Sequence, residues 1–240
     1  AVRTLGLSEV KPFDARAAII EARLASTAPL VGMTLAGFAD ELSSDSPAPG
    51  GGSVAAYAGA LAAGLATMVA NLSHPKRGFE AKQPALERIA VRGQALKDRL
   101  LAAVDADTAA FDRYLAAMRM PKESAEERTL RDAAMVVATI ATIEVPLGTL
   151  EACPEIVELC LEIGAIGLQA SLSDAGTGAA MARAAASGAF QNVCINLPGL
   201  ADRQVAAQLL KRADSAWKRT CNRAAQAEAK FVDGLRQAAD

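Results

Sequence analysis

The feature that most constrains this chain is an uncharged run of nineteen residues, at positions 54–72, made mainly of alanine and glycine. At about 1.5 Å of rise per residue, the run is just long enough to cross a membrane. Alanine and glycine favour insertion far less than leucine or isoleucine, and no aromatic belt flanks the run. We therefore interpret it as a buried helix of a bundle, with a subunit interface as a further possibility.

The rest of the composition also favours helices. Aromatic residues make up only 4% of the 240 residues, and alanine is the best helix former. Helical spacing of apolar residues predicts helices at about 34–42, 51–72, 84–118, from 124 onward, from about 173, and at 200–235. Only "VCINL" resembles a strand. The expected fold is all-α, an up-and-down bundle of long helices.

One of these helices carries conflicting signals. Ser124 and Glu127 match the capping box at its start. The same helix then meets Pro146 and Pro154, and proline interrupts helical hydrogen bonding. We expect a kink there, or two shorter helices.

Charge and residue counts exclude several classes of function. The net charge of −2, with both signs interspersed, leaves no footprint for nucleic acid or an anionic membrane, so small molecules or other chains are the expected partners. The four cysteines form no C-x-x-C pair, and no apolar signal segment opens the chain. We expect free thiols in the cytoplasm. A single histidine, His74, excludes a His-rich zinc site and leaves a Ser-His-Asp triad dependent on one residue.

The segment "PAPGGGS" at residues 47–53 reads like a linker, yet it directly precedes the uncharged helix. The first amides of a helix lack intrahelical partners, and the helix dipole places partial positive charge there. Glycines would let a carboxylate or phosphate approach these amides. No G-K-[ST] follows, so a Walker phosphate loop is excluded. A plain glycine turn is the alternative.

Few side chains remain for acid–base chemistry. Asp107 and Asp112 interrupt the alanine-rich segment "DADTAAFDRYLAAM", Lys122 follows a helix break, and Asp174 lies in "SDAG". Burial would shift their pKa values. The alternatives are a solvated helix face for Asp112 and a helix cap for Asp174 or its neighbour Ser173.

Several segments taken together resemble one family. "FADELSSDSPAPGGGSVAAYAGALAAGLATMVANL", "DTAAFDRYLAAMRMPK", "EVPL", "SDAG" and "NVCINL" are similar, in this order, to the cyclodeaminase/cyclohydrolase family of tetrahydrofolate enzymes. The resemblance implies an all-helical fold, commonly a homodimer or a higher homo-oligomer, with a tetrahydrofolate derivative as substrate and no metal or prosthetic group. It implies cyclisation of 5-formiminotetrahydrofolate to 5,10-methenyltetrahydrofolate with loss of ammonia. The sister activity hydrolyses 5,10-methenyltetrahydrofolate to 10-formyltetrahydrofolate.

The resemblance also assigns roles to residues. Asp107 and Asp174 would handle protons or stabilise the cationic product, and Lys122 would act as an acid or hold a carboxylate. Asn192 and Asn196 would offer amide hydrogen bonds to the pterin, with backbone capping as their alternative role. The substrate-binding set is expected to comprise Pro49, Gly50, Gly51, Gly52, Ser53, Lys76, Ser173, Asn192 and Asn196.

The two ends of the resemblance differ. Residues 34–240 correspond to the helical cyclodeaminase-like domain. Residues 1–33 resemble an N-terminal arm at the junction with a formiminotransferase module, which is itself a possible partner. Gly78 and Phe79 stand where relatives carry lysine and tyrosine, and Leu168 and Ala170 where relatives tend to carry asparagine. These departures keep open a non-catalytic folate-binding or assembly module.

Overall fold

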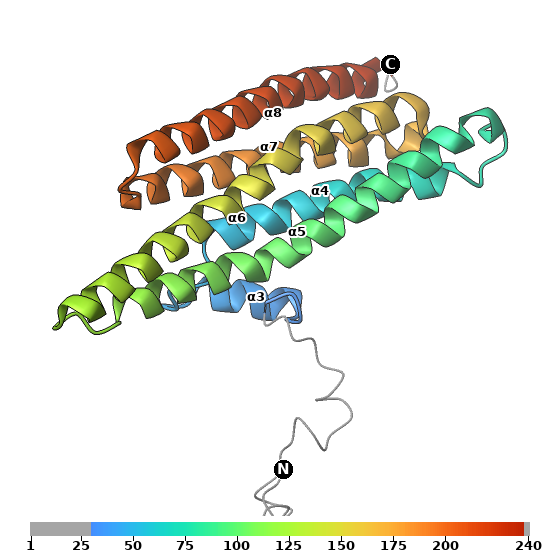
Figure 1. Cartoon of the computed structure of the whole chain (residues 1–240). Helices are drawn as coiled ribbons and strands as arrows, with labels where there is room; N and C mark the ends of the chain where they lie inside the picture. Colours follow the sequence, from blue (N-terminus) through green and yellow to red (C-terminus); the bar gives the residue numbers. More distant parts are fainter. Residues whose placement is uncertain (1–29, 238–240) are drawn as a thin grey trace, which may run out of the picture.

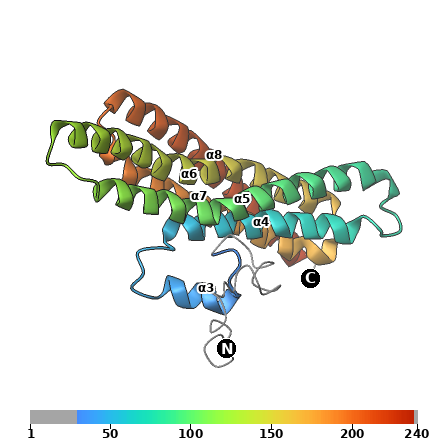
Figure 2. The same cartoon turned by 60° about the horizontal axis from the view of Figure 1, so that its bottom comes forward.

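The computed structural model describes residues 30–237, and every regular element within that range is helical. The helices are α3 (Leu35–Leu42), α4 (Gly51–Ser73), α5 (Gln83–Met118), α6 (Ala125–Ile166), α7 (Leu172–Asn196) and α8 (Arg203–Gln237). Helices α4 to α8 run alternately up and down, and the short α3 lies beside the bundle (Figures 1 and 2). The all-α, up-and-down fold predicted from the sequence is confirmed.

Helix α4 is a core helix, as its sequence predicts. Many of its alanines are fully or almost fully buried, among them Ala60, Ala62, Ala63, Ala66 and Ala70. The neighbouring helices come very close to it at glycines. A Cβ on Gly93 of α5 would lie 2.3 Å from Thr67 Oγ1, and one on Gly178 of α7 would lie 3.2 Å from the Ala62 carbonyl oxygen. Small residues thus allow α5 and α7 to pack directly against the α4 backbone.

Two helices, α4 and α6, are long and apolar enough to pass a length-and-hydropathy test for a membrane span. Core helices of bundles pass the same test, and 61% and 44% of their respective apolar windows are buried inside the protein. The burial of α4 against α5 and α7 agrees with its interpretation as a core helix.

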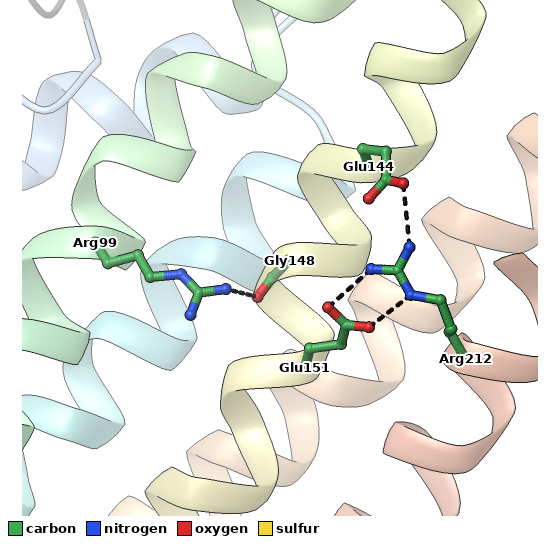
Figure 3. A network of polar contacts seen from close by, with 5 residues as sticks. All are labelled: Arg99, Glu144, Gly148, Glu151 and Arg212. Atoms are coloured by element: carbon green, nitrogen blue, oxygen red, sulfur yellow. Dashed lines mark hydrogen bonds and ion pairs between the residues drawn. The ribbon is translucent and has the colours of Figure 1, made fainter.

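Polar contacts hold α6 on two sides. Arg212 of α8 forms ion pairs with Glu144 at 3.2 Å and with Glu151 at 3.0 Å, and Arg99 Nη2 of α5 donates to the Gly148 carbonyl at 2.7 Å (Figure 3). Further pairs join α6 to α5 and α8: Arg88–Glu162, Arg92–Glu155 and Arg223–Glu158. Each exposed pair adds little stability, so their main effect is to fix the register of α6 between its neighbours.

The capping box at Ser124 and Glu127 is confirmed: each side chain bonds the other residue's backbone. Of the two alternatives expected at the prolines, two shorter helices is wrong, because α6 runs unbroken through Pro146 and Pro154. A kink stays a prediction. Both prolines are buried in the bundle, where neighbouring helices support the backbone that proline weakens.

The start of α7 also differs from the prediction. Ser171 is the N-cap residue and the helix begins at Leu172, so neither Ser173 nor Asp174 is the cap. The physical reason is a 3₁₀ turn, Gln169–Ser171, that winds directly into the helix. "VCINL" is no strand, because its first four residues continue the alanine-rich α7 and its leucine opens a 3₁₀ turn. The junction-like arm predicted at residues 1–33 overlaps residues 1–29, which lie outside the described range, and it stays a prediction.

The close approach of α5 to α4 at Gly93 leads to a prediction about stability. Gly93→Ala would force its methyl group against Thr67, and overpacking of this kind costs about 1–3 kcal/mol of unfolding free energy. Gly148→Ala on α6 is the matched control, because its added Cβ would make only an ordinary contact, 3.6 Å from Arg99 Nη2, and it should be neutral or stabilising by up to about 1 kcal/mol. Urea denaturation measures both. Equal stability of the two variants would contradict the close approach.

Candidate functional site

A cavity of about 230 Å³ lies at the N-terminal end of α4. The loop before α4 forms one wall, and α5, α6 and α7 each contribute side chains. Its lining residues are Pro47, Ala48, Gly50, Gly51, Gly52, Asp107, Thr108, Phe111, Thr142, Asn192, Ile195 and Asn196. The glycine triplet, Asp107 and both asparagines, all proposed from the sequence, therefore lie together.

Asp107 packs against the first turn of α4. A Cβ on Gly52 would lie only 2.2 Å from Asp107 Oδ1, so glycine is required for the carboxyl to take this position. Ser53, which is fully buried, places its Oγ 3.1 Å from Asp107 Oδ2 and 3.0 Å from the Val104 carbonyl oxygen. The "GGGS" segment thus seats a carboxyl group of the same chain where the sequence suggested a ligand anion.

The environment of Asp107 makes its carboxyl group a weaker acid than a free aspartate. Burial raises the pKa of Asp107, and hydrogen bonds from Ser53 oppose that rise. Within residues 30–237, no lysine, arginine or histidine forms an ion pair with this carboxyl. Ser53 Oγ lies within hydrogen-bonding distance of the Val104 carbonyl and of Asp107 Oδ2, and it lies 3.4 Å from Thr108 Oγ1. The carboxyl group therefore shares the single Ser53 hydroxyl proton with other acceptors.

Asn192 and Asn196 lie on the last turns of α7 and face the cavity from the other side. Asn192 Nδ2 donates to the Gly188 carbonyl at 2.9 Å, and it contacts Gly51, whose added Cβ would lie 3.1 Å away. Asn196 Nδ2 donates to the Asn192 carbonyl at 3.0 Å and to the Thr142 carbonyl of α6 at 2.9 Å. Both side-chain NH₂ groups therefore bond backbone carbonyls near the end of α7, which agrees with the alternative role predicted for these asparagines.

Other proposed site residues lie elsewhere in the chain. Ser173 and Asp174 begin α7, and eighteen residues of helix put Asp174 about 27 Å from Asn192 along the axis. Lys76 is exposed just beyond the C-terminal end of α4, at that same distant end. Lys122 is exposed in the link between α5 and α6, a hairpin that projects past the other helices (Figures 1 and 2). A single chain does not bring these four residues to the cavity.

Two members of the expected binding set lie behind the cavity wall. Pro49 is buried in the loop before α4, after a cis Ala48–Pro49 bond, and Ser53 is buried against Asp107. The departures from the family pattern, Gly78, Phe79, Leu168 and Ala170, flank the C-terminal end of α4 and the start of α7. They therefore leave this cavity unchanged within one chain.

Sequence reasoning missed several lining residues. Phe111 stands four residues after Asp107 and Ile195 three residues after Asn192, so helical spacing around the chosen residues would have found both. No sequence pattern pointed to Thr142, because it lies on α6, a helix that carries none of the residues proposed for the site.

The possible metal ligands and the thiols of the described residues are both located in the structure. Residues 30–237 hold no group of three or more His, Cys, Asp or Glu side chains placed to bind a metal. All four cysteines are free. Burial raises the pKa of Cys153 and of Cys160 to about 12, which keeps both thiols protonated at neutral pH.

Comparison with known proteins places the chain. The family model for formiminotransferase-cyclodeaminase matches residues 34–215. The chain belongs to this family. A crystal structure of formiminotetrahydrofolate cyclodeaminase from Thermotoga maritima superposes with a TM-score of 0.74 at 25% identity, covering 85% of this chain and 97% of that one. The resemblance seen in the sequence and the all-α fold are both confirmed.

Curated relatives of this formiminotransferase-cyclodeaminase family member fall into two groups. The formimidoyltransferase-cyclodeaminase of Sus scrofa is 34% identical over 217 residues, which are 89% of this chain and 40% of that protein. The methenyltetrahydrofolate cyclohydrolase of Methylorubrum extorquens is 34% identical over 178 residues, which are 74% of this chain and 86% of that protein. The chain thus spans about 40% of the length of the formimidoyltransferase-cyclodeaminase that it matches.

The raised pKa of Asp107 predicts a pH-dependent stability difference. Ionisation of Asp107 costs folding free energy once the pH exceeds its ordinary pKa of about 3.9, and the cost is complete above its folded pKa. Asp107→Asn cannot ionise, so at pH 7 to 8 its melting temperature should exceed that of the wild type. The difference should shrink as the pH falls below about 4. A wild type that gains on the variant as the pH rises would show that the pKa is lowered.

Proposed function

We propose that this chain is a formiminotetrahydrofolate cyclodeaminase, an ammonia lyase of histidine degradation that converts 5-formiminotetrahydrofolate to 5,10-methenyltetrahydrofolate. Membership of the folate one-carbon family supports the substrate class. The observation that carries the reaction is Asp107, a half-buried carboxyl with a raised pKa on the wall of the cavity. A raised pKa makes the carboxylate a better proton acceptor than a free aspartate, which suits a group that takes up a proton and returns it.

The chemistry requires one proton to change place. N10 of the folate attacks the formimino carbon and forms a new C–N bond, and its proton must then leave. The former imino nitrogen must gain a proton before its bond to carbon breaks and ammonia departs. Asp107 would take the proton from N10 and give it to the leaving nitrogen. The protonated formimino group and the methenyl product are both cations, so the ionised carboxylate also stabilises the reacting carbon.

Two features of the cavity suit this role. Thr108 and Phe111 follow Asp107 on α5 and line the same space, so the Phe111 ring gives the wall an apolar part. The fixed asparagines provide polar groups on the opposite wall. A rigid cavity that holds N10 close to the formimino carbon supplies the proximity on which cyclisation depends.

A second candidate is methenyltetrahydrofolate cyclohydrolase. The match to the Methylorubrum extorquens enzyme, which covers 86% of that protein, favours it. Water would add to the methenyl carbon and lose one proton to Asp107. The new hydroxyl group would then lose its second proton as the formyl C=O forms, the bond from carbon to N5 would break, and N5 would gain one proton. One proton is released overall, and 10-formyltetrahydrofolate results. Both reactions use one proton-transfer group beside a cationic carbon.

The decisive experiment follows the methenyl chromophore with the purified chain. With 5-formiminotetrahydrofolate we expect methenyl formation together with ammonia release, and Asp107→Asn should lower kcat by about 100-fold or more. Asp112→Asn is the matched control, since Asp112 lies on the same helix but is exposed, and it should retain wild-type activity.

Each other outcome selects a different function. Consumption of methenyltetrahydrofolate without any reaction of the formimino substrate would favour the cyclohydrolase. Folate binding without turnover of either substrate would identify a non-catalytic binding or assembly module. Full activity of Asp107→Asn would remove Asp107 from the mechanism.

We propose further that a second copy of the chain covers the outer face of α4. That face exposes apolar side chains: Val54, Leu61, Met68 and Leu72. Beside it lies an apolar groove of about 550 Å³ that includes Gly64. An uncharged helix face meets its own copy across a two-fold axis without opposing like charges, and Gly64 permits close approach. The cytoplasmic location, and association with a formiminotransferase module, stay predictions from the sequence.

Light scattering tests the dimer. Leu61→Glu should convert a wild-type dimer into a monomer, because a charge would be buried at the interface. Val91→Glu on α5 is the control, since its side chain is 66% exposed on another helix, and it should remain dimeric. A monomeric wild type, or a dimeric Leu61→Glu variant, would disprove this interface.

A further inference from the structure

Pro146 leaves one backbone carbonyl of α6 without its usual partner. In a helix each N–H bonds the carbonyl four residues earlier, and proline has no N–H to give. The Thr142 carbonyl is the one affected. Thr142 is buried at 9% exposure, and a buried carbonyl requires a donor. That donor is Asn196 Nδ2 of α7, at 2.9 Å.

This contact determines which end of the Asn196 amide faces the cavity. Its two N–H groups are used by the Thr142 and Asn192 carbonyls, and only N–H groups can face two carbonyl oxygens. Asn196 Oδ1 accepts no hydrogen bond from any residue of the described range, and Asn196 lines the cavity. The residue is therefore presented to a ligand as an acceptor alone.

We propose that Pro146 is a positioning residue, which frees the Thr142 carbonyl so that Asn196 presents its Oδ1 to an N–H donor of the substrate. A pterin ring carries amino and ring N–H groups of this kind. The identity of the ligand rests on the proposed function, whereas the orientation of Asn196 rests on its two hydrogen bonds, to the Thr142 and Asn192 carbonyls. The "EVPL" segment thereby takes part in ligand recognition, because its proline, Pro146, orients the Asn196 side chain of α7.

Pro154 provides a matched control on the same helix. It is also buried within α6 and removes an N–H in the same way. It lies beside Glu151 and Arg212, in a groove on another face of the bundle. Restoring the N–H at this position leaves the Thr142 carbonyl and Asn196 untouched.

The first test compares Pro146→Ala with Pro154→Ala. The new N–H in Pro146→Ala competes for the Thr142 carbonyl and releases Asn196. We expect KM, and the Kd for 5-formyltetrahydrofolate, to rise about ten-fold, the effect of one lost hydrogen bond, while kcat changes less than about two-fold. Pro154→Ala should leave both constants unchanged. Equal constants for Pro146→Ala and the wild type would overturn the proposal.

Two further measurements separate positioning from a general structural effect. In the Asn196→Ala background, Pro146→Ala should add nothing, because its effect passes through that side chain; additive effects would overturn the proposal. The side-chain NH₂ resonances of Asn196 in the ¹⁵N-labelled protein should shift in Pro146→Ala and not in Pro154→Ala. This measurement needs no ligand. If the wild type binds no folate, the proposed function fails, and the resonances alone decide whether Pro146 orients Asn196.

Discussion

The structure depends on how closely other helices approach the backbone of α4. Alanines and glycines leave no side chain between α4 and its neighbours, and a Cβ at Gly93 or Gly178 would clash across these contacts. The same closeness recurs at Gly52, where α5 brings Asp107 against the first turn. The packing that forms the core therefore also places the carboxyl group of the cavity. A larger residue at Gly52 would displace the carboxyl.

The position of the Asp107 carboxyl group lowers the stability of the fold while it provides a proton-transfer group at the cavity. Burial opposes ionisation of Asp107, and no cation in the described range offsets that cost. An asparagine would fit the same space without the penalty but could not carry a proton. Energetic costs of this kind concentrate at functional sites, and this one falls on the carboxyl that lines the cavity. Ser53 limits the cost by hydrogen bonding while remaining hidden from the ligand.

Local sequence was sufficient for part of the site. The glycines before an uncharged helix, and an aspartate interrupting an alanine-rich one, predicted Gly52 and Asp107 without any knowledge of how the helices pair. Asp174 and Lys122 do not lie at the cavity within one chain. A short motif does not reveal at which end of a helical bundle it lies. Helical rise supplies part of that information: eighteen residues separate Asp174 from Asn192, or about 27 Å. Thr142 was beyond reach, since its place depends on the packing of α6 against α7.

The proline in α6 illustrates why a local rule can mislead. Proline in a helix interior costs about 3 kcal/mol relative to alanine, which made a broken helix the natural expectation. The helix runs unbroken through both prolines, and at Pro146 the freed Thr142 carbonyl accepts a hydrogen bond from a side-chain donor, Asn196, on the neighbouring helix. A defect in one helix thus becomes a contact between two, and the contact orients a polar group at the cavity. The free-energy cost of Pro146 falls on α6 alone. The oriented amide of Asn196, in contrast, belongs to a site built from four segments of the chain. The sequence of α6 by itself therefore gives no reason for Pro146.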